Sequence, residues 1–269
     1  MKKMKKSINF MSCFLLALAL NTCLADMDNS EYFGFDEFLE ELCVTYQNVC
    51  PSVTDAIEYP EFWYDVNNPF VPYDETIRST STCGLLVTLL ERPLFVMMVP
   101  GSDLFEPRIT KFNNELQLNK VALEFFDRGD FYSVLVGKYL SVIKLSGTAA
   151  SSIVDGPSYI EWIFASDMCM SAMSEKEKIQ LMAVALERTK YAVDFEINQA
   201  CMIMISIMKS CKYAPFMKDI EPRLVEVMSG YAMRETDSKV PINALLSHDR
   251  DVIIKYAKQF LCEQKITAL

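Results

Sequence analysis

The fold is decided by residues 174–208, which read SEKEKIQLMAVALERTKYAVDFEINQACMIMISIM. Ser174 and Glu177 have the spacing of a capping box, in which the two side chains satisfy free backbone amides at the start of a helix. The apolar residues that follow at helical spacing are Ile179, Met182, Ala183 and Leu186. Residues 200–208 are apolar apart from Ser206. We therefore expect them to form a central helix, which is too short to span a membrane.

Helical periodicity continues on both sides of this stretch. Apolar stripes run over residues 118–126, 132–143 and 253–261, and a second capping box pairs Ser158 with Glu161. Between the first two stripes we expect Gly129 to end a helix, because glycine tolerates a positive φ. Helix pairs begin near residues 112, 158, 194 and 241, at intervals like those of HEAT-like proteins. We therefore predict an all-α fold, either an irregular multi-helix bundle or a short HEAT-like α-solenoid built from antiparallel helix pairs.

The N-terminal third has a different pattern. Residues 35–46 predict a helix, residues 51–78 contain four prolines and predict loops, and four leucines before Pro93 predict an apolar hairpin (Leu85, Leu86, Leu89 and Leu90). A strand or a second buried helix is expected over residues 94–99. We divide the chain into residues 1–25, 26–110 and 111–269, with the last two expected to form one continuous globule.

Residues 1–25 resemble a bacterial secretory signal. Four lysines precede an apolar stretch over residues 10–20, and small residues follow. Cleavage after Ala25 would release a soluble protein. Alternatively, residues 20–23 (LNTC) resemble a lipobox, which would leave Cys23 lipidated, although Thr22 is unusual before such a cysteine. Both alternatives predict export to the periplasm or outer envelope, with membrane contact only through an N-terminal lipid.

The charge of the chain limits its partners. Residues 1–25 carry four lysines and no acidic residue, so their removal takes the formal net charge from −10 to −14. Such a charge repels nucleic acid and favours a basic protein as the partner. Seven cysteines remain, an odd number without the spacing of a disulfide framework. We expect most of them to pack in the core, with Cys43–Cys50 as a candidate bridge.

No catalytic constellation or cofactor site stands out. His248 is the only histidine, and we expect it to be solvated or capping. Ser141 with Lys144 and Ser206 with Lys209 match the spacing of serine–lysine acylases, but they lack the companion motifs of those enzymes. The acidic positions Asp26, Asp28, Ser30 and Glu37 mimic a calcium loop, yet Glu31 occupies the position that requires glycine. We expect no catalytic residue, no metal and no cofactor.

Methionine is concentrated between residues 168 and 233, which contain ten of the thirteen methionines after Ala25. Cys169 and Cys201 lie among them. Thioether and thiolate groups are ligands that Cu(I) prefers, and a methionine-rich surface also suits an adaptable binding groove. Core filling is the interpretation that we favour, because these residues lie within helical apolar stripes.

The best candidate site is an aromatic–acidic segment, residues 58–75. It combines aromatic and acidic side chains with prolines, and its binding residues are expected to be Tyr59, Glu61, Phe62, Trp63, Tyr64 and Asp65. Aromatic side chains of this kind often anchor protein interfaces, although they also pin loops onto helices. We therefore expect an exported, non-enzymatic protein that binds another macromolecule, in an immunity, inhibitor or scaffold role. The alternative is an envelope hydrolase that uses carboxylate or serine–lysine chemistry.

Overall fold

The computed structural model describes residues 41–42, 44–46, 49–50, 55–58, 72–91, 105–143, 157–192, 194–219 and 247–267. Residues 1–25, Cys23 among them, residues 94–99 and the calcium-like positions lie outside these ranges. Every regular element that the structure describes is an α-helix, so the all-α prediction is confirmed. The helices are α3 (Asp74–Ser79), α4 (Thr82–Glu91), α5 (Phe105–Leu118), α6 (Lys120–Asp127), α7 (Phe131–Val142), α8 (Pro157–Ala165), α9 (Asp167–Ala172), α10 (Glu175–Tyr191), α11 (Asp194–Ser210), α12 (Ala214–Asp219) and α14 (Ser247–Thr267).

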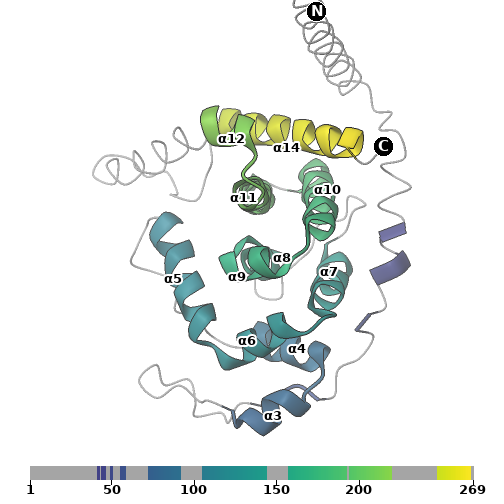
Figure 1. Cartoon of the computed structure of the whole chain (residues 1–269), viewed down its shortest axis with the longest axis vertical. Helices are drawn as coiled ribbons and strands as arrows, with labels where there is room; N and C mark the ends of the chain where they lie inside the picture. Colours follow the sequence, from purple (N-terminus) through teal and green to yellow (C-terminus); the bar gives the residue numbers. More distant parts are fainter. Residues whose placement is uncertain are drawn as a thin grey trace, which may run out of the picture.

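The helices stack in an order that follows the chain. Figure 1 shows α3 and α14 at opposite ends of the stack, with α8 to α11 between them. Helix α11 contacts α8, α10 and α14, whereas α4 contacts α6 and α7. The helices differ in length from six to 21 residues, so the described part of the stack is not built from equal repeats.

The predicted central region is confirmed. Residues 181–188 of α10 and 198–204 of α11 are buried without interruption, because neighbouring helices cover these two helices on several faces. Ser174 caps α10 by accepting a hydrogen bond from the Glu177 amide, while the Glu177 carboxylate accepts one from the Ser174 amide. The predicted capping box of Ser174 and Glu177 is therefore confirmed. None of the described helices combines the length and the apolar run needed to cross a membrane.

The starts of α6 and α9 were not predicted. The predicted stripe over residues 118–126 is interrupted at Asn119, whose backbone is extended and whose side chain accepts hydrogen bonds from the amides of Val121 and Ala122. This cap starts a new helix in a new direction. As a result Leu118, which we expected to face the core, is 83% exposed. Ser166 caps α9 in the same way by accepting from the Cys169 amide.

Other local predictions need correction. The four leucines expected in the first arm of the apolar hairpin lie in helix α4, where Leu85, Leu86 and Leu89 are buried together; the second arm, residues 94–99, lies outside the described residues. The loop-rich range 51–78 includes most of α3. Gly129 lies in the turn between α6 and α7 as predicted, but its φ is not in the left-handed region.

Candidate functional site

N-terminal residues form a strap across α7 and α4. We use this name for the described residues Tyr46, Val49, Cys50 and 55–58. At α7, a Cβ atom added to Gly137 would overlap the Tyr46 carbonyl oxygen, so the strap lies directly on the helix backbone there. The Tyr46 ring packs edge-on against Tyr132, with 6.1 Å between ring centroids. Absence of a side chain at residue 137 therefore permits this crossing.

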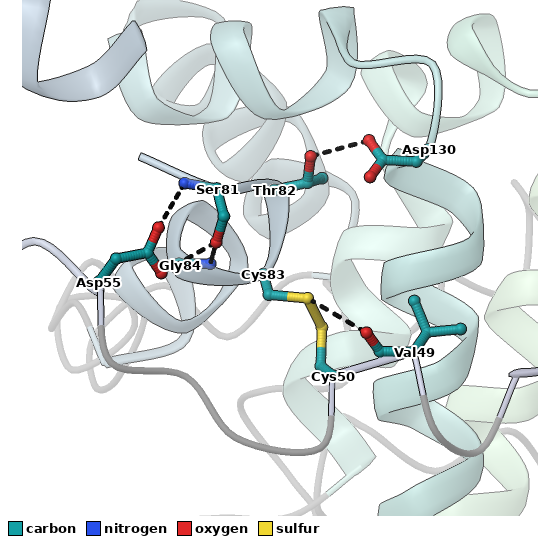
Figure 2. The surroundings of a disulfide bond; sticks show 8 residues. All are labelled: Val49, Cys50, Asp55, Ser81, Thr82, Cys83, Gly84 and Asp130. Carbon is teal, nitrogen blue, oxygen red and sulfur yellow. Dashed lines mark hydrogen bonds between the residues drawn. A yellow bond between two sulfur atoms is a disulfide. The ribbon is translucent and has the colours of Figure 1, made fainter. Parts of the chain in front are cut away.

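A disulfide joins the strap to α4. Figure 2 shows the bond between Cys50 and Cys83, whose Cα atoms are 6.0 Å apart. The Cys83 sulfur also lies 3.6 Å from the Val49 carbonyl oxygen. The predicted bridge between Cys43 and Cys50 is wrong, because Cys50 pairs with a residue 33 positions away. Sequence spacing alone could not show this partner, since contacts between distant segments decide it.

Asp55 attaches the strap to the N-terminus of α4. Its carboxylate accepts hydrogen bonds from the amide and the hydroxyl of Ser81 (Figure 2). These bonds stabilise the charged form and lower the pKa of Asp55. A Cβ atom at Gly84 would lie 2.5 Å from the same carboxylate and 2.7 Å from Thr80 Cγ2. Glycine at position 84 is therefore required for the close approach of Asp55 to the helix.

The strap makes one further anchored contact. The Ile57 amide donates to the Thr88 hydroxyl at 2.8 Å, and this hydroxyl donates to the Gly84 carbonyl at 2.7 Å. Thr88 is fully buried and Ile57 nearly so. Both hydrogen-bonding roles of one buried hydroxyl are thus satisfied, which fixes the backbone of residue 57 against α4.

The structure describes only the two ends of the aromatic–acidic segment. Glu58 is the last residue of the strap, Tyr73 directly precedes α3, and Asp74 and Glu75 lie in the first turn of α3. The six predicted binding residues between Tyr59 and Asp65 lie outside the described ranges. At the described end, Tyr73 is 83% exposed, whereas the neighbouring Pro72 and Ile77 are buried. One aromatic side chain of the segment is therefore available to a ligand.

Exposed apolar side chains occur on the helices near Tyr73. Lys120 of α6 donates to the Asp74 carboxylate at 2.8 Å, which joins the starts of α6 and α3 and lowers the pKa of Asp74. Leu123, one turn further along α6, is 48% exposed, and Leu118 is the last residue of α5. Tyr73, Leu118, Leu123 and the Asp74–Lys120 ion pair make up what we call the α3–α6 face.

A buried polar cluster was missed by the sequence analysis. Tyr139 of α7 donates to Glu161 of α8 at 2.6 Å, and Arg188 Nε of α10 lies 3.6 Å from the same carboxylate oxygen. All three side chains are almost completely buried. Glu161 was assigned to a capping box with Ser158, and this is wrong because its carboxylate faces the core. A glutamate flanked by Ile160 and Ile163 in a buried helix was the available signal.

The serine–lysine pairs do not show an activated serine. The Ser206 hydroxyl donates to the Ala165 carbonyl at 3.0 Å, and Ser141 donates to the Lys138 carbonyl at 2.7 Å. Each hydroxyl proton is thus directed at a backbone oxygen and not at a lysine amine, which is the base that a serine nucleophile needs. Lys144 lies outside the described residues, as does the side chain of His248, whose backbone belongs to α14.

Most of the described methionines and cysteines between residues 168 and 233 fill the core, as the sequence predicted. Cys169, Cys201, Met204 and Met208 are completely buried. Burial raises the pKa of the Cys169 thiol well above its ordinary range and that of the Cys201 thiol to about 12. Protonated thiols are poor nucleophiles, and the complete burial of these side chains supports core packing as their role.

The described residues contain no group of three or more histidine, cysteine, aspartate or glutamate side chains placed to hold a metal ion. We take the candidate site to be the strap, the described ends of the aromatic–acidic segment and the α3–α6 face. Comparisons with protein families, with curated proteins and with solved structures found no match for this chain.

Proposed function

We propose that this chain is an exported, non-enzymatic binding protein that recognises a basic protein through its aromatic–acidic segment. An immunity or inhibitor role, in which a basic protein is neutralised in the envelope, is the specific version that we favour. The single observation that carries the proposal is the 83% exposure of Tyr73 beside a buried proline and a buried isoleucine. The backbone is anchored at this point while the aromatic ring projects outward.

Anchored ends support the proposal. Before the segment, Ile57 and Asp55 hold the chain against α4. After it, Ile77 fixes α3 in the core and Asp74 is paired with Lys120. A segment whose ends are fixed loses less conformational entropy on binding than a free chain does. This favours binding by a segment whose two described ends are held by the helices.

Charge and surface chemistry support a basic partner. The formal net charge is −10 for the whole chain, and Glu58, Asp74 and Glu75 are exposed at the described ends of the segment. Complementary charge accelerates association and excludes acidic competitors. The apolar side chains of the α3–α6 face add contact area next to these charges. We therefore expect binding that combines aromatic anchors with salt-sensitive attraction.

The test uses the two tryptophans of the chain. Trp162 packs edge-on against Phe112 at 6.0 Å, within the helical stack, whereas Trp63 is the proposed anchor. In Trp162→Phe, Trp63 becomes the only tryptophan, and its fluorescence is titrated with a synthetic lysine-rich peptide and with a glutamate-rich peptide of equal length. We expect quenching or a spectral shift with the lysine-rich peptide only. The response should weaken as salt is raised, because salt screens the charges.

Variants then separate binding from folding. Trp63→Ala and Tyr73→Ala should weaken binding of the lysine-rich peptide, measured by calorimetry, while the melting temperature changes little. The paired change Glu61→Gln and Asp65→Asn should remove most of the salt dependence. Trp162→Phe is the matched control, and we expect it to lower the melting temperature and leave binding intact. If Trp63→Ala destabilises the fold by several kcal/mol, as core truncations do, the segment is structural and the proposal is wrong.

A further inference from the structure

We propose that redox conditions control the attachment of the strap to α4 through the Cys50–Cys83 disulfide. The corner between α3 and α4 then reaches its final form only after the two thiols are oxidised. The sulfur atoms join two segments that are 33 positions apart in sequence. Both cysteines are partly exposed, so an external thiol or disulfide can reach the bond. The inference goes beyond the proposed function and rests on it only where partner binding is concerned.

The remaining attachments of the strap to α4 are few. Among the described residues they are the two hydrogen bonds from Ser81 to Asp55, the hydrogen bond from Ile57 to Thr88, and the burial of the Ile57 side chain. Asp55 and Ser81 are exposed, so water competes for their hydrogen bonds as soon as the strap moves. Without the disulfide, closing the intervening loop costs entropy that these weak contacts must offset.

The strap reaches the corner that carries the proposed binding surface. Ser81 lies between the end of α3 and the start of α4, and Asp55 accepts the hydrogen bonds that its amide and its hydroxyl donate. Thr82, the next residue, donates to Asp130 at the start of α7 at 2.7 Å (Figure 2). Release of Asp55 would therefore loosen the α3–α4 corner from one side while Asp130 still holds it from the other. Tyr73 lies at the other end of α3.

Thiol–disulfide exchange supplies the chemistry. A disulfide of the dithiol-oxidase class accepts two electrons from the Cys50 and Cys83 thiols. Two protons are transferred to the oxidant, which becomes a dithiol, and the bond between the two sulfur atoms forms. The reverse reaction with a dithiol reductant opens it. Cys169 and Cys201 do not compete for these partners, because both are buried and their thiols stay protonated.

The test measures hydrogen exchange in the oxidised chain, in the same chain after reduction with dithiothreitol, and in the Cys50→Ser/Cys83→Ser variant. The informative amides are those of Ile57 and Ser81, which donate the hydrogen bonds of the strap. We expect their exchange to accelerate about tenfold or more on reduction, as local opening does. The control amide is that of Cys211, which directly follows α11 and donates to the Ile207 carbonyl, and we expect its exchange to change little. Cys43→Ser is the matched control variant and should behave like the unmodified chain.

Two outcomes would overturn the inference. Unchanged exchange at Ile57 and Ser81 would mean that the hydrogen bonds alone hold the strap. Equal acceleration at Cys211 would mean that the disulfide stabilises the whole fold and controls no local step. Affinity for the lysine-rich peptide is measured in parallel and should fall on reduction. If it stays constant while the strap loosens, the link between strap and binding surface is refuted. If the oxidised chain fails to bind the peptide at all, the proposed function is contradicted, and the exchange test still decides the strap.

Discussion

Replacement of Gly137 by alanine tests whether the strap is held against α7. Alanine is favoured over glycine inside a helix by about 1 kcal/mol, so helix propensity alone predicts a more stable protein. The added Cβ would overlap the Tyr46 carbonyl oxygen and lie 3.4 Å from Val49 Cβ. A backbone oxygen cannot move as a flexible side chain does, so the strap must shift as a unit.

The expected magnitude follows from these opposing effects. Overpacking of this kind costs about 1–3 kcal/mol. Displacement of Tyr46 also weakens its edge-on contact with Tyr132, a type of contact that contributes about 0.5–1.5 kcal/mol. After the helix-propensity gain is subtracted, we expect Gly137→Ala to lower the free energy of unfolding by about 1–3 kcal/mol.

Urea denaturation followed by far-UV circular dichroism measures this change. The matched control is Gly129→Ala, because a Cβ atom there would meet nothing within 4 Å and the backbone is not left-handed. It should change the free energy of unfolding by less than about 0.5 kcal/mol or raise it slightly. Equal or higher stability of Gly137→Ala relative to the unmodified chain would refute the placement of the strap on α7.

A double-mutant cycle extends the test to the disulfide. Removal of a bridge that closes a loop of this length costs about 4 kcal/mol in the loop-entropy account. In the Cys50→Ser/Cys83→Ser background the strap can move away at less cost. The loss of unfolding free energy caused by Gly137→Ala should therefore be smaller in this background. The change should approach the gain that helix propensity alone predicts. Additive changes would show that the disulfide and the crossing at α7 are independent.

Three further predictions concern the core and one turn. In urea denaturation, Tyr139→Phe should lower the free energy of unfolding by about 1–3 kcal/mol, because it removes the hydrogen bond to the buried Glu161 carboxylate. The control Tyr132→Phe should be nearly neutral in the same measurement, because no described residue pairs with the Tyr132 hydroxyl. Lys212→Gly should raise the melting temperature by a few degrees in calorimetry, since Lys212 has a φ of 50° and glycine adopts this conformation without strain. Alkylation at pH 8 followed by peptide mass spectrometry should label Cys211 well before Cys201, because a pKa of about 12 leaves only about 10⁻⁴ of the Cys201 thiol as thiolate; similar rates would show that Cys201 is accessible.

The sequence predicted the parts of the fold that local patterns control. The capping box at Ser174 and the burial of residues 200–204 follow from spacing along one helix, and the structure has both. The break at Asn119 was missed because the apolar periodicity continues past it, and an asparagine can lie inside a helix or, with greater preference, cap one. Which of the two forms depends on the packing of α6 against α4 and α3, and this lies beyond local periodicity.

Contacts between distant segments explain the remaining errors. Glu161 has the sequence context of a capping residue, yet Tyr139 and Arg188 from two other helices attract its carboxylate into the core. Cys50 has Cys43 as its nearest neighbour in sequence, yet its partner is Cys83. The bridge has no local signature, and the apolar neighbours of Glu161 indicate its burial but not its partners. Both depend on how several helices lie relative to one another, whereas a sequence pattern predicts each helix separately.

The two glycines on the path of the strap connect these observations. Gly137 and Gly84 each lie inside a helix, where glycine lowers stability relative to alanine by about 0.5–1 kcal/mol. At both positions a Cβ atom would collide with the strap, at Tyr46 and at Asp55 respectively. Glycine in α7 and α4 therefore costs helix stability, and at both positions it permits the close approach of the same N-terminal segment. Because that segment also contains Cys50 and leads directly into the aromatic–acidic segment, its position on the two helices determines where the proposed binding segment begins.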